Sequence, residues 1–145
     1  MRKLVVIVFA VLMGCNEILE CELDPNVEYA VVGFYNSADS TEKEVKFNLV
    51  SNSQFAYYDA LDSGVFFPLP LDPSQESITY LFETDSDTYN LTLSYELQAV
   101  QLYSLDCGGS FGFDSLKAFT TAFDSTAVIG PTINKNILVN VEVYF

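Results

Sequence analysis

The sequence has 145 residues, half of them apolar, and its 20 acidic and 6 basic residues give a formal net charge of −14 at pH 7. This acidity excludes nucleic acid and anionic lipid surfaces as expected partners, because both would be repelled. The 12 phenylalanines and 9 tyrosines exclude an intrinsically disordered chain. The chain contains no histidine, so the most common general base and metal ligand is missing.

The first predicted element is a signal peptide over residues 1–14. Arg2 and Lys3 form a positively charged start, and an unbroken run of ten apolar residues follows from Leu4 to Met13. As a helix this run would be about 15 Å long, half of the roughly 30 Å apolar thickness of a bilayer. The run is therefore typical of a signal peptide and too short for a membrane-spanning helix.

The signal ends in Leu12-Met13-Gly14-Cys15, which resembles the lipobox of bacterial lipoproteins. This resemblance implies cleavage before Cys15 and acylation of Cys15, so a lipid would hold the protein at a membrane. The alternative is an ordinary secretory signal, whose cleavage site has small residues at the first and third positions before the cut. Leu12 occupies the third position and does not fit that rule.

Cleavage would leave 131 residues, which is close to the most common size of one domain. The net charge would then be −16, because residues 1–14 contain two basic residues and no acidic residue. Residues 15–20 would be the lipidated cysteine with a short tether, and residues 21–145 a single domain.

Two further cysteines, Cys21 and Cys107, lie in the predicted domain. An exported protein folds in an oxidising compartment, so we expect these two cysteines to form a disulfide. The bond would close a loop of 86 residue steps. Such a loop is worth about 4–5 kcal/mol in the chain-entropy model. Two separate buried thiols are the alternative.

Much of the remaining chain consists of short segments in which apolar and polar residues alternate, as in half-buried strands. The predicted strands are 29–35, 45–49, 55–61, 65–67, 78–82, 89–97, 100–105 and 137–145. Pro68 and Pro70 favour an edge strand or a linker, because proline has no N–H to donate. Segment 83–88 has the composition of a hairpin loop, and Gly108-Gly109 that of a flexible turn.

Segment 111–123 is ambiguous. Phe113, Leu116 and Phe119 partly follow the spacing of a helical face, whereas the threonine and phenylalanine content favours a strand. With no clear helix elsewhere, eight or nine short strands predict an all-β fold, and we expect an antiparallel β-sandwich. A small β-barrel is the alternative.

No catalytic, cofactor-binding or metal site is predicted, and the simpler interpretation of two groups of acidic residues is a solvated turn. Glu83, Asp85 and Asp87 are spaced to wrap a Ca²⁺ ion, but they lack the glycine and the bidentate glutamate of an EF-hand loop. Asp59 and Asp62 resemble the carboxylate pair of a glycosidase. Such a pair needs two different pKa environments.

Most aromatic side chains are expected in the core. Tyr144 lies opposite the predicted inward face of the last strand, and one of the consecutive Tyr57 and Tyr58 also points outward. Outward aromatic residues of this kind are those that would form a binding face.

Several short stretches spread over the chain after the signal peptide carry a family resemblance. They are Cys15, Cys21, Phe34-Tyr35-Asn36, Leu69-Pro70-Leu71-Asp72-Pro73, Leu93-Ser94-Tyr95, Cys107-Gly108 and Asn136-Ile137. Together they are similar to a group of small uncharacterised lipoproteins from Bacteroidota. The resemblance implies an outer-membrane lipoprotein with a β-sandwich-like fold, on the periplasmic face or at the cell surface, and no particular activity.

We therefore expect a lipid-anchored cell-envelope protein with a structural or protein-interaction role, no enzymatic activity and no cofactor. The expected contacts are the membrane, through the lipid on Cys15, and an envelope protein. A module that binds a glycan, a peptide or Ca²⁺ is the alternative, and a hydrolase using carboxylates alone is a third hypothesis. An interaction role predicts a flat or edge-strand contact surface, whereas a ligand-binding module predicts exposed aromatics beside a groove.

Overall fold

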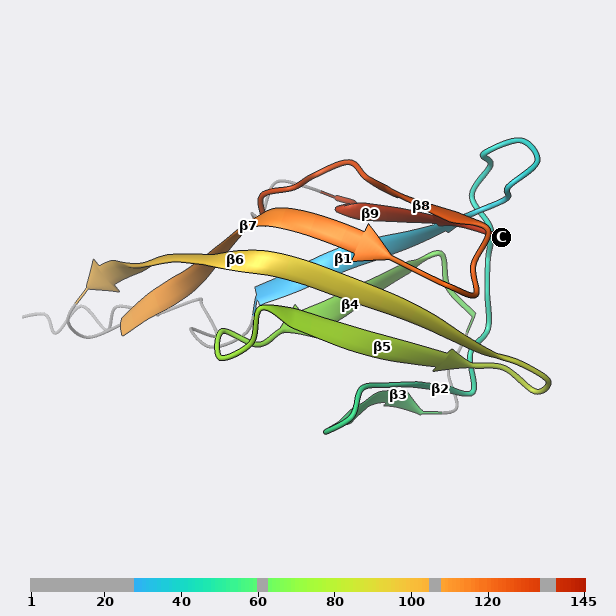
Figure 1. The fold of residues 1–145 in the computed structure, drawn as a ribbon, viewed down its shortest axis with the longest axis horizontal. Coiled ribbons are helices and arrows are strands. Elements are labelled where there is room, and N and C mark those ends of the chain that lie inside the picture. The colour runs from blue at the N-terminus through green and yellow to red at the C-terminus, as the bar shows by residue number, and fades with distance from the viewer. Residues whose placement is uncertain (1–27, 60–62, 105–107, 134–137) are drawn as a thin grey trace, which may run out of the picture.

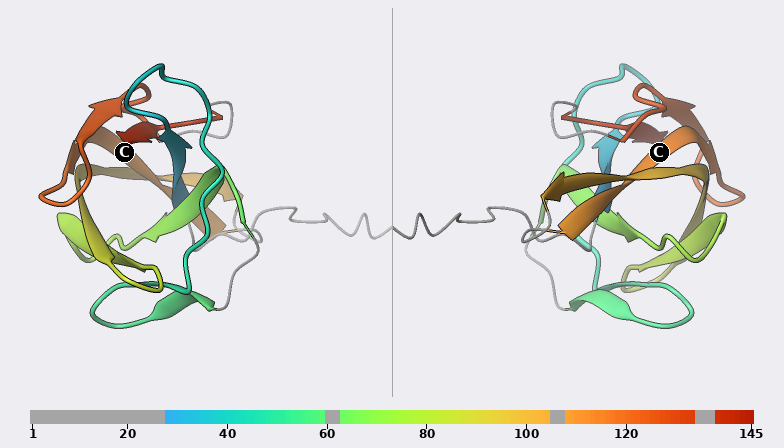
Figure 2. Two further views of the ribbon diagram at one scale, coloured as in Figure 1. Left: turned by 90° about the vertical axis from the view of Figure 1, so that its right-hand side faces the viewer. Right: turned by 90° about the vertical axis from the view of Figure 1, so that its left-hand side faces the viewer.

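The computed structural model describes residues 28–59, 63–104, 108–133 and 138–145, which form nine strands in two sheets (Figure 1). This all-β sandwich confirms the predicted fold class, and no described residue lies in a helix. The described strands form two open sheets and not the closed barrel of the alternative. Seen along the long axis, the sheets surround the space that the core side chains fill (Figure 2).

The first sheet contains four strands in the order β4 (Phe66–Leu71), β1 (Glu28–Tyr35), β9 (Val141–Tyr144) and β8 (Ser125–Val128). β1 pairs antiparallel with β4 but parallel with β9, so one pair departs from the purely antiparallel arrangement that was expected. Parallel neighbours need a long crossover connection. The chain between β1 and β9, which contains the whole second sheet, supplies it.

The second sheet contains five antiparallel strands in the order β3 (Ala56–Asp59), β2 (Leu49–Ser51), β5 (Ser77–Glu83), β6 (Thr88–Ser104) and β7 (Gly108–Phe119). β5 confirms the strand predicted at 78–82. A hydrogen bond of 2.8 Å from Thr84 N to Asp87 O closes the predicted hairpin between β5 and β6. β6 is continuous and joins the two predicted strands 89–97 and 100–105.

The core lies between the two sheets and is centred on Phe34 of β1, which is fully buried. Five phenylalanine rings, in tilted or edge-to-face orientations, have centroids 5.2–5.8 Å from the Phe34 ring: Phe47, Phe67, Phe82, Phe123 and Phe145. An aromatic pair of this kind adds roughly 0.5–1.5 kcal/mol beyond the burial of its area. Because the rings come from both sheets, the cluster holds the sheets together.

The strand predicted at 45–49 is mostly a crossing segment between the sheets. Lys43 N donates a hydrogen bond of 2.9 Å to the first sheet, and Asn48 N donates one of 2.7 Å to the second. Because the chain leaves one sheet before it reaches the other, it forms no ladder along most of this segment. Val45 and Phe47 are nevertheless both buried, as the alternation predicts.

A β-bulge at Ser115 explains the partly helical spacing of segment 111–123. Two residue steps of β6 face three of β7 there, so one extra residue is accommodated. Ser115 has a φ of 55°, in the left-handed region. The extra residue brings Phe113 and Leu116, three positions apart, onto the same buried face. The segment is therefore a strand as far as Phe119.

Several strand boundaries differ from the prediction, and β4 extends to Leu71 beyond the predicted 65–67. β7 begins at Gly108, so Gly108-Gly109 belongs to a strand and not to a flexible turn. β9 covers only residues 141–144 of the predicted 137–145. β8 has no counterpart among the predicted strands, because its one exposed and three half-buried residues carry no alternating signal.

β4 is an edge strand, as its prolines predict. Pro68 pairs with Val31 and Pro70 with Tyr29, in positions that need no N–H from β4. An edge that lacks these donors is a poor template for a further strand, which protects the sheet from edge-to-edge association.

Asn140, directly before β9, joins β1 to the segment that follows β8, and it is 1% exposed. Its Oδ1 accepts a hydrogen bond of 2.9 Å from Val31 N, and its Nδ2 donates one of 3.2 Å to Gly130 O. Its backbone N also donates to Val31 O at 2.8 Å. Both ends of the buried amide are therefore satisfied, which is typical of a structural asparagine.

Replacing Asn140 by alanine should lower the free energy of unfolding by about 2–4 kcal/mol, because the buried Gly130 O and the part-buried Val31 N lose their partners, and a fully buried group left without a partner costs about 1–3 kcal/mol. Denaturant unfolding measures this loss. The control is Asn48→Ala, whose amide bonds the exposed Asp85 and whose loss should stay below about 0.5 kcal/mol. Equal losses in the two variants would contradict a structural role for Asn140.

Candidate functional site

The signal peptide and four candidate site residues lie outside the described part of the chain. The four residues are the predicted lipidation site Cys15, the predicted disulfide partners Cys21 and Cys107, and Asp62. For Asp59, only the backbone in β3 is described. The lipidation and the disulfide therefore stay predictions, and the carboxylate pair stays a hypothesis.

Glu83 ends β5, and Asp85 and Asp87 lie in the exposed tip of the hairpin between β5 and β6. Asp85 Oδ1 accepts a hydrogen bond of 2.7 Å from Asn48 Nδ2, and Asp87 accepts one from the Ser86 hydroxyl. Within the described ranges, no three acidic, histidine or cysteine side chains are grouped to hold a metal ion. The carboxylates of this tip are thus engaged by neighbouring polar side chains.

The outer face of the first sheet carries a continuous row of aromatic, proline and aliphatic side chains. Residues paired across neighbouring strands point to the same side of a sheet, and their neighbours in the chain point to the other. By this register, nine residues of β4, β1 and β9 share the outer side, and we call them the aromatic face: Tyr29, Val31, Gly33, Tyr35, Phe66, Pro68, Pro70, Glu142 and Tyr144.

Gly33 lets two rings of the aromatic face lie flat on the sheet. A Cβ atom at this position would come 2.9 Å from Tyr35 Cε2, closer than real Cβ contacts, and 3.2 Å from Phe66 Cε1, a tight contact. Any larger residue would therefore displace the Tyr35 ring from its place over the strand. At the other end of the row, Tyr29 is 46% exposed, and Phe66 itself remains 45% exposed. The rings of the face are therefore only partly buried.

Carboxylates gather where β1 and β9 end. The Tyr35 and Tyr144 rings have centroids 5.8 Å apart at an interplanar angle of 36°. Tyr144 OH donates a hydrogen bond of 2.5 Å to Glu142 Oε2, and Glu42 pairs with Tyr35 in an isolated bridge. Burial, followed by the charges of Glu142 and Glu42, raises the pKa of the Tyr35 phenol. The hydrogen bond with Glu142 is the main cause that raises the pKa of Tyr144.

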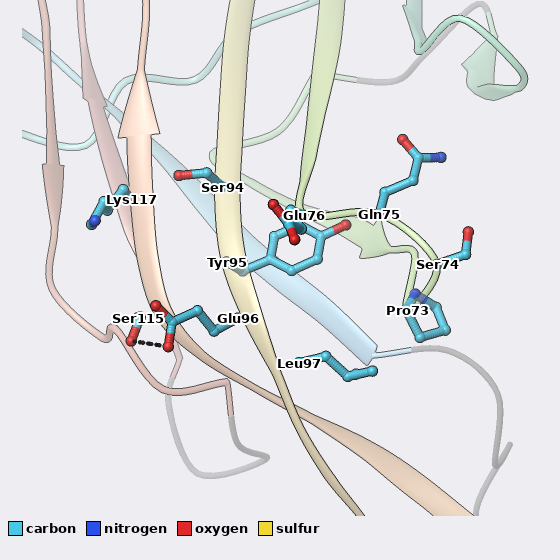
Figure 3. A pocket seen from close by; sticks show the side chains of 10 residues that line it. All are labelled: Pro73, Ser74, Gln75, Glu76, Ser94, Tyr95, Glu96, Leu97, Ser115 and Lys117. Carbon is cyan, nitrogen blue, oxygen red and sulfur yellow. Dashed lines mark hydrogen bonds between the residues drawn. The ribbon is translucent and has the colours of Figure 1, made fainter.

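An open groove of about 620 Å³ lies beside the turn between β4 and β5 (Figure 3). Its lining residues are Pro73, Ser74, Gln75, Glu76, Ser94, Tyr95, Glu96, Leu97, Ser115 and Lys117. Ser115, the bulge residue with the left-handed φ, donates a hydrogen bond of 3.3 Å to Glu96 in its wall. The lining is mainly polar and mixes two carboxylates with one ammonium group.

Hydrogen bonds from two tyrosine hydroxyls of the second sheet hold the turn beside this groove and the end of β4 that leads into it. Tyr95 OH donates to Asp72 O at 3.0 Å and accepts from Asp72 N at 3.1 Å. Tyr80 OH donates to Pro70 O. Burial raises the pKa of the Tyr80 phenol far above its usual value and also raises the pKa of Tyr95. The hydroxyl and backbone N–H of Ser74 lower the pKa of Asp72. The phenols are therefore neutral donors and the carboxyl is ionised at neutral pH.

A second hollow, of about 260 Å³, lies on the other side of the same turn. Phe55, Tyr57, Pro70 and Pro73 supply its apolar lining, and the Phe55 ring is 62% exposed. Asn52 Oδ1 accepts bonds from the backbone of the loop, and its Nδ2 donates to Tyr57 OH at 2.7 Å. Of the consecutive Tyr57 and Tyr58, Tyr57 thus lines a hollow.

The alternation predicted the outward position of Tyr144 but missed Tyr29, Tyr35 and Phe66. β1 is apolar on both faces, so its sequence gives no sign of which residues face outward. The one usable signal was Gly33 in the middle of an otherwise bulky strand, since a glycine there often marks a close approach of other groups.

No known protein family, curated protein or solved structure matches the chain. In the part of the chain that the structure describes, no helix is long and apolar enough to cross a bilayer.

Stability should fall as the pH rises above about 10. Free tyrosine ionises near pH 10, whereas burial raises the pKa of Tyr57, Tyr80 and Tyr95 in the folded state. The unfolded chain therefore loses protons first, so stability is complete below that pH and declines above it. Denaturant unfolding at several alkaline pH values, with tyrosinate absorbance, measures the effect. Tyr95→Phe should weaken the pH dependence, and the exposed Tyr29→Phe should not; an identical profile in both variants would contradict this origin.

Proposed function

We propose that this protein is a lipid-anchored, non-catalytic interaction protein of the bacterial cell envelope that contacts a partner protein through its aromatic face. The lipid on Cys15 would hold it at the outer membrane, and a disulfide between Cys21 and Cys107 would staple the domain. One observation carries the proposal: aromatic and proline side chains dominate the outer side of β4, β1 and β9, where a solvent-facing strand normally carries polar residues.

The composition of the aromatic face supports a protein partner. Aromatic residues are enriched in the buried centres of protein interfaces, where they supply large contact areas. Tyr29 and Phe66 are each nearly half exposed and lie on neighbouring strands of a hydrogen-bonded sheet. A partner that covers these rings gains their burial without first ordering a loop, which lowers the entropic cost of binding.

The carboxylates support a non-catalytic role. Asp39, Asp72 and Asp114 each have a lowered pKa, chiefly because the hydroxyl of a neighbouring serine or threonine donates to them. Acids held ionised in this way are poor proton donors at neutral pH, whereas a carboxylate-only hydrolase needs one acid with a raised pKa. The chain also has no histidine that could act instead.

A ligand-binding module is the second candidate, and the groove beside the turn between β4 and β5 favours it. Its volume suits a small ligand, and the strained backbone of Ser115 lies in its wall. Strain of this kind is often found at functional sites. The groove lacks the exposed row of aromatics that such a module predicts, since Tyr95 is 4% exposed.

A photo-crosslinking residue placed at Phe66 in living cells should form a discrete adduct with an envelope protein, because the proposed partner covers this ring. The measurement is an immunoblot of the cross-linked membrane fraction. The matched control is the same residue at Leu81, an exposed apolar position on the second sheet. The Phe66 adduct should also disappear in a Tyr29→Ser background. Equal adducts at both positions, or none at Phe66, would count against the aromatic face.

The intact mass of the membrane-extracted protein should match residues 15–145 plus acyl chains, because the lipobox predicts both cleavage before Cys15 and acylation of Cys15. Reduction should add the mass of two hydrogens if Cys21 and Cys107 are bridged. A Cys15→Ser variant should lack the acyl mass and leave the membrane fraction. An unacylated native protein would contradict the proposed lipid anchor but would leave the proposed role of the aromatic face unchanged.

A further inference from the structure

The aromatic face is electrically asymmetric. At one end, Tyr29 lies beside Pro70, and the row continues through Val31 and Pro68 without a charged side chain. At the other end, Glu142 pairs with Gly33 on the face itself, and Glu42 pairs with Tyr35 at its border. The two ends of the same surface therefore differ in the chemistry that they can recognise.

The acidic end has the geometry to receive a cation. The two tyrosine rings have centroids 5.8 Å apart, and the charges of Glu142 and Glu42 both act on the Tyr35 phenol. Glu142 is half-buried, and the hydrogen bond from Tyr144 uses its Oε2. A carboxylate has lone pairs for further donors. Glu42 is exposed. Ring faces and carboxylates together are the groups that attract a planar cation.

The lysine beside Glu42 serves another part of the fold. Lys43 Nζ donates a hydrogen bond of 2.7 Å to Phe145 O and lies 3.9 Å from the centroid of the Phe145 ring. This contact combines an aromatic ring and an oxygen acceptor around one cation. Lys43 is thus engaged with Phe145, and no hydrogen bond among the described residues joins it to Glu42 or Glu142.

We propose that Tyr35, Tyr144, Glu142 and Glu42 bind the guanidinium group of an arginine in a basic segment of the partner protein. The inference rests on the proposed function and names the chemistry of its partner. The arginine would stack on the tyrosine rings while its N–H groups reach the carboxylates. The rest of that segment would lie along β1, over Val31, Phe66 and Tyr29.

Charge and shape favour arginine over the other groups a partner could offer. An anion would be repelled by the carboxylates and by the net charge of −14. A guanidinium is planar, stacks on aromatic rings and binds carboxylates with two parallel hydrogen bonds, whereas an ammonium is a strongly hydrated point charge. The raised pKa values of both tyrosines leave their rings neutral at pH 7, so their faces remain attractive to a cation.

The length of the face favours a chain segment over a free small molecule. β1 has eight residues, which at about 3.3 Å per residue span roughly 25 Å. The apolar side chains along that length would cover an extended segment of similar size. The cation at one end would then set the register and direction of the partner on the strand.

The test measures binding of a labelled, end-capped peptide with two arginines separated by glycine to the membrane-extracted full protein in detergent, by fluorescence anisotropy. The same peptide with citrulline keeps the shape but removes the charge, and a lysine peptide keeps the charge but changes the shape. We expect the arginine peptide to bind at least about fivefold more tightly than either analogue, and binding to weaken as salt rises.

Variants locate the binding on the protein. Glu142→Gln and Tyr144→Leu should each weaken arginine-peptide binding about 2- to 10-fold, whereas Tyr144→Phe keeps the ring and should stay within about twofold. Asp87→Asn removes the same charge from the hairpin on the second sheet and should have no effect. Thermal unfolding of each variant confirms that the fold is intact.

Three results would overturn the proposal. Equal binding of the citrulline peptide would exclude recognition of the charge, and equal binding of the lysine peptide would exclude recognition of the guanidinium. An equal loss in Asp87→Asn and Glu142→Gln would assign the binding to net charge alone. If the photo-crosslinker at Phe66 still captures a partner, the interface stands and only the arginine assignment fails.

Discussion

Packing around Phe34 is the interaction on which the rest of the structure depends. Its ring contacts Phe67 on the neighbouring strand β4, Phe82 in the second sheet and Phe145 directly after β9. Each contact joins a different segment, so one side chain sets the distance between the sheets and the place of β9 beside β1. Because protein interiors are close-packed, none of these rings can move without displacing the others. β1 is thereby fixed as an inner strand of its sheet.

The inward direction of Phe34 also determines what the outer face presents. Its neighbours Gly33 and Tyr35 must point outward, because side chains alternate along a strand. Every residue from Tyr29 to Tyr35 except the glycine is apolar or aromatic, a composition typical of strands covered on both sides. The second sheet covers one side. On the other side, the Tyr35 and Phe66 rings fold over Gly33 and cover the strand only in part.

Alternation predicted the strands that have one buried and one exposed face. In β5, Ile78, Tyr80 and Phe82 are all buried, as their spacing indicates. It could not predict features that depend on contacts distant in sequence. Asn140 meets Val31 across 109 residues, and this bond, with the cluster around Phe34, places β9 parallel to β1. The bulge at Ser115 shifts the alternation by one residue and imitates a helical period, so only the threonine and phenylalanine content of the segment favoured a strand.

The candidate site was predictable only where one strand alternates clearly. Tyr144 follows Val143, so its outward position could be derived, but its neighbour Tyr35 comes from a strand apolar on both faces. The acidic end depends on still more distant pairing, because Glu42 and Glu142 are 100 residues apart in the sequence. The hydrogen-bonded strands β1 and β9 bring both rings and Glu142 together, and the bridge to Tyr35 adds Glu42 from the segment after β1. Such a surface can recognise a partner at little entropic cost, which is why the cation site and the apolar row are best understood as one interface.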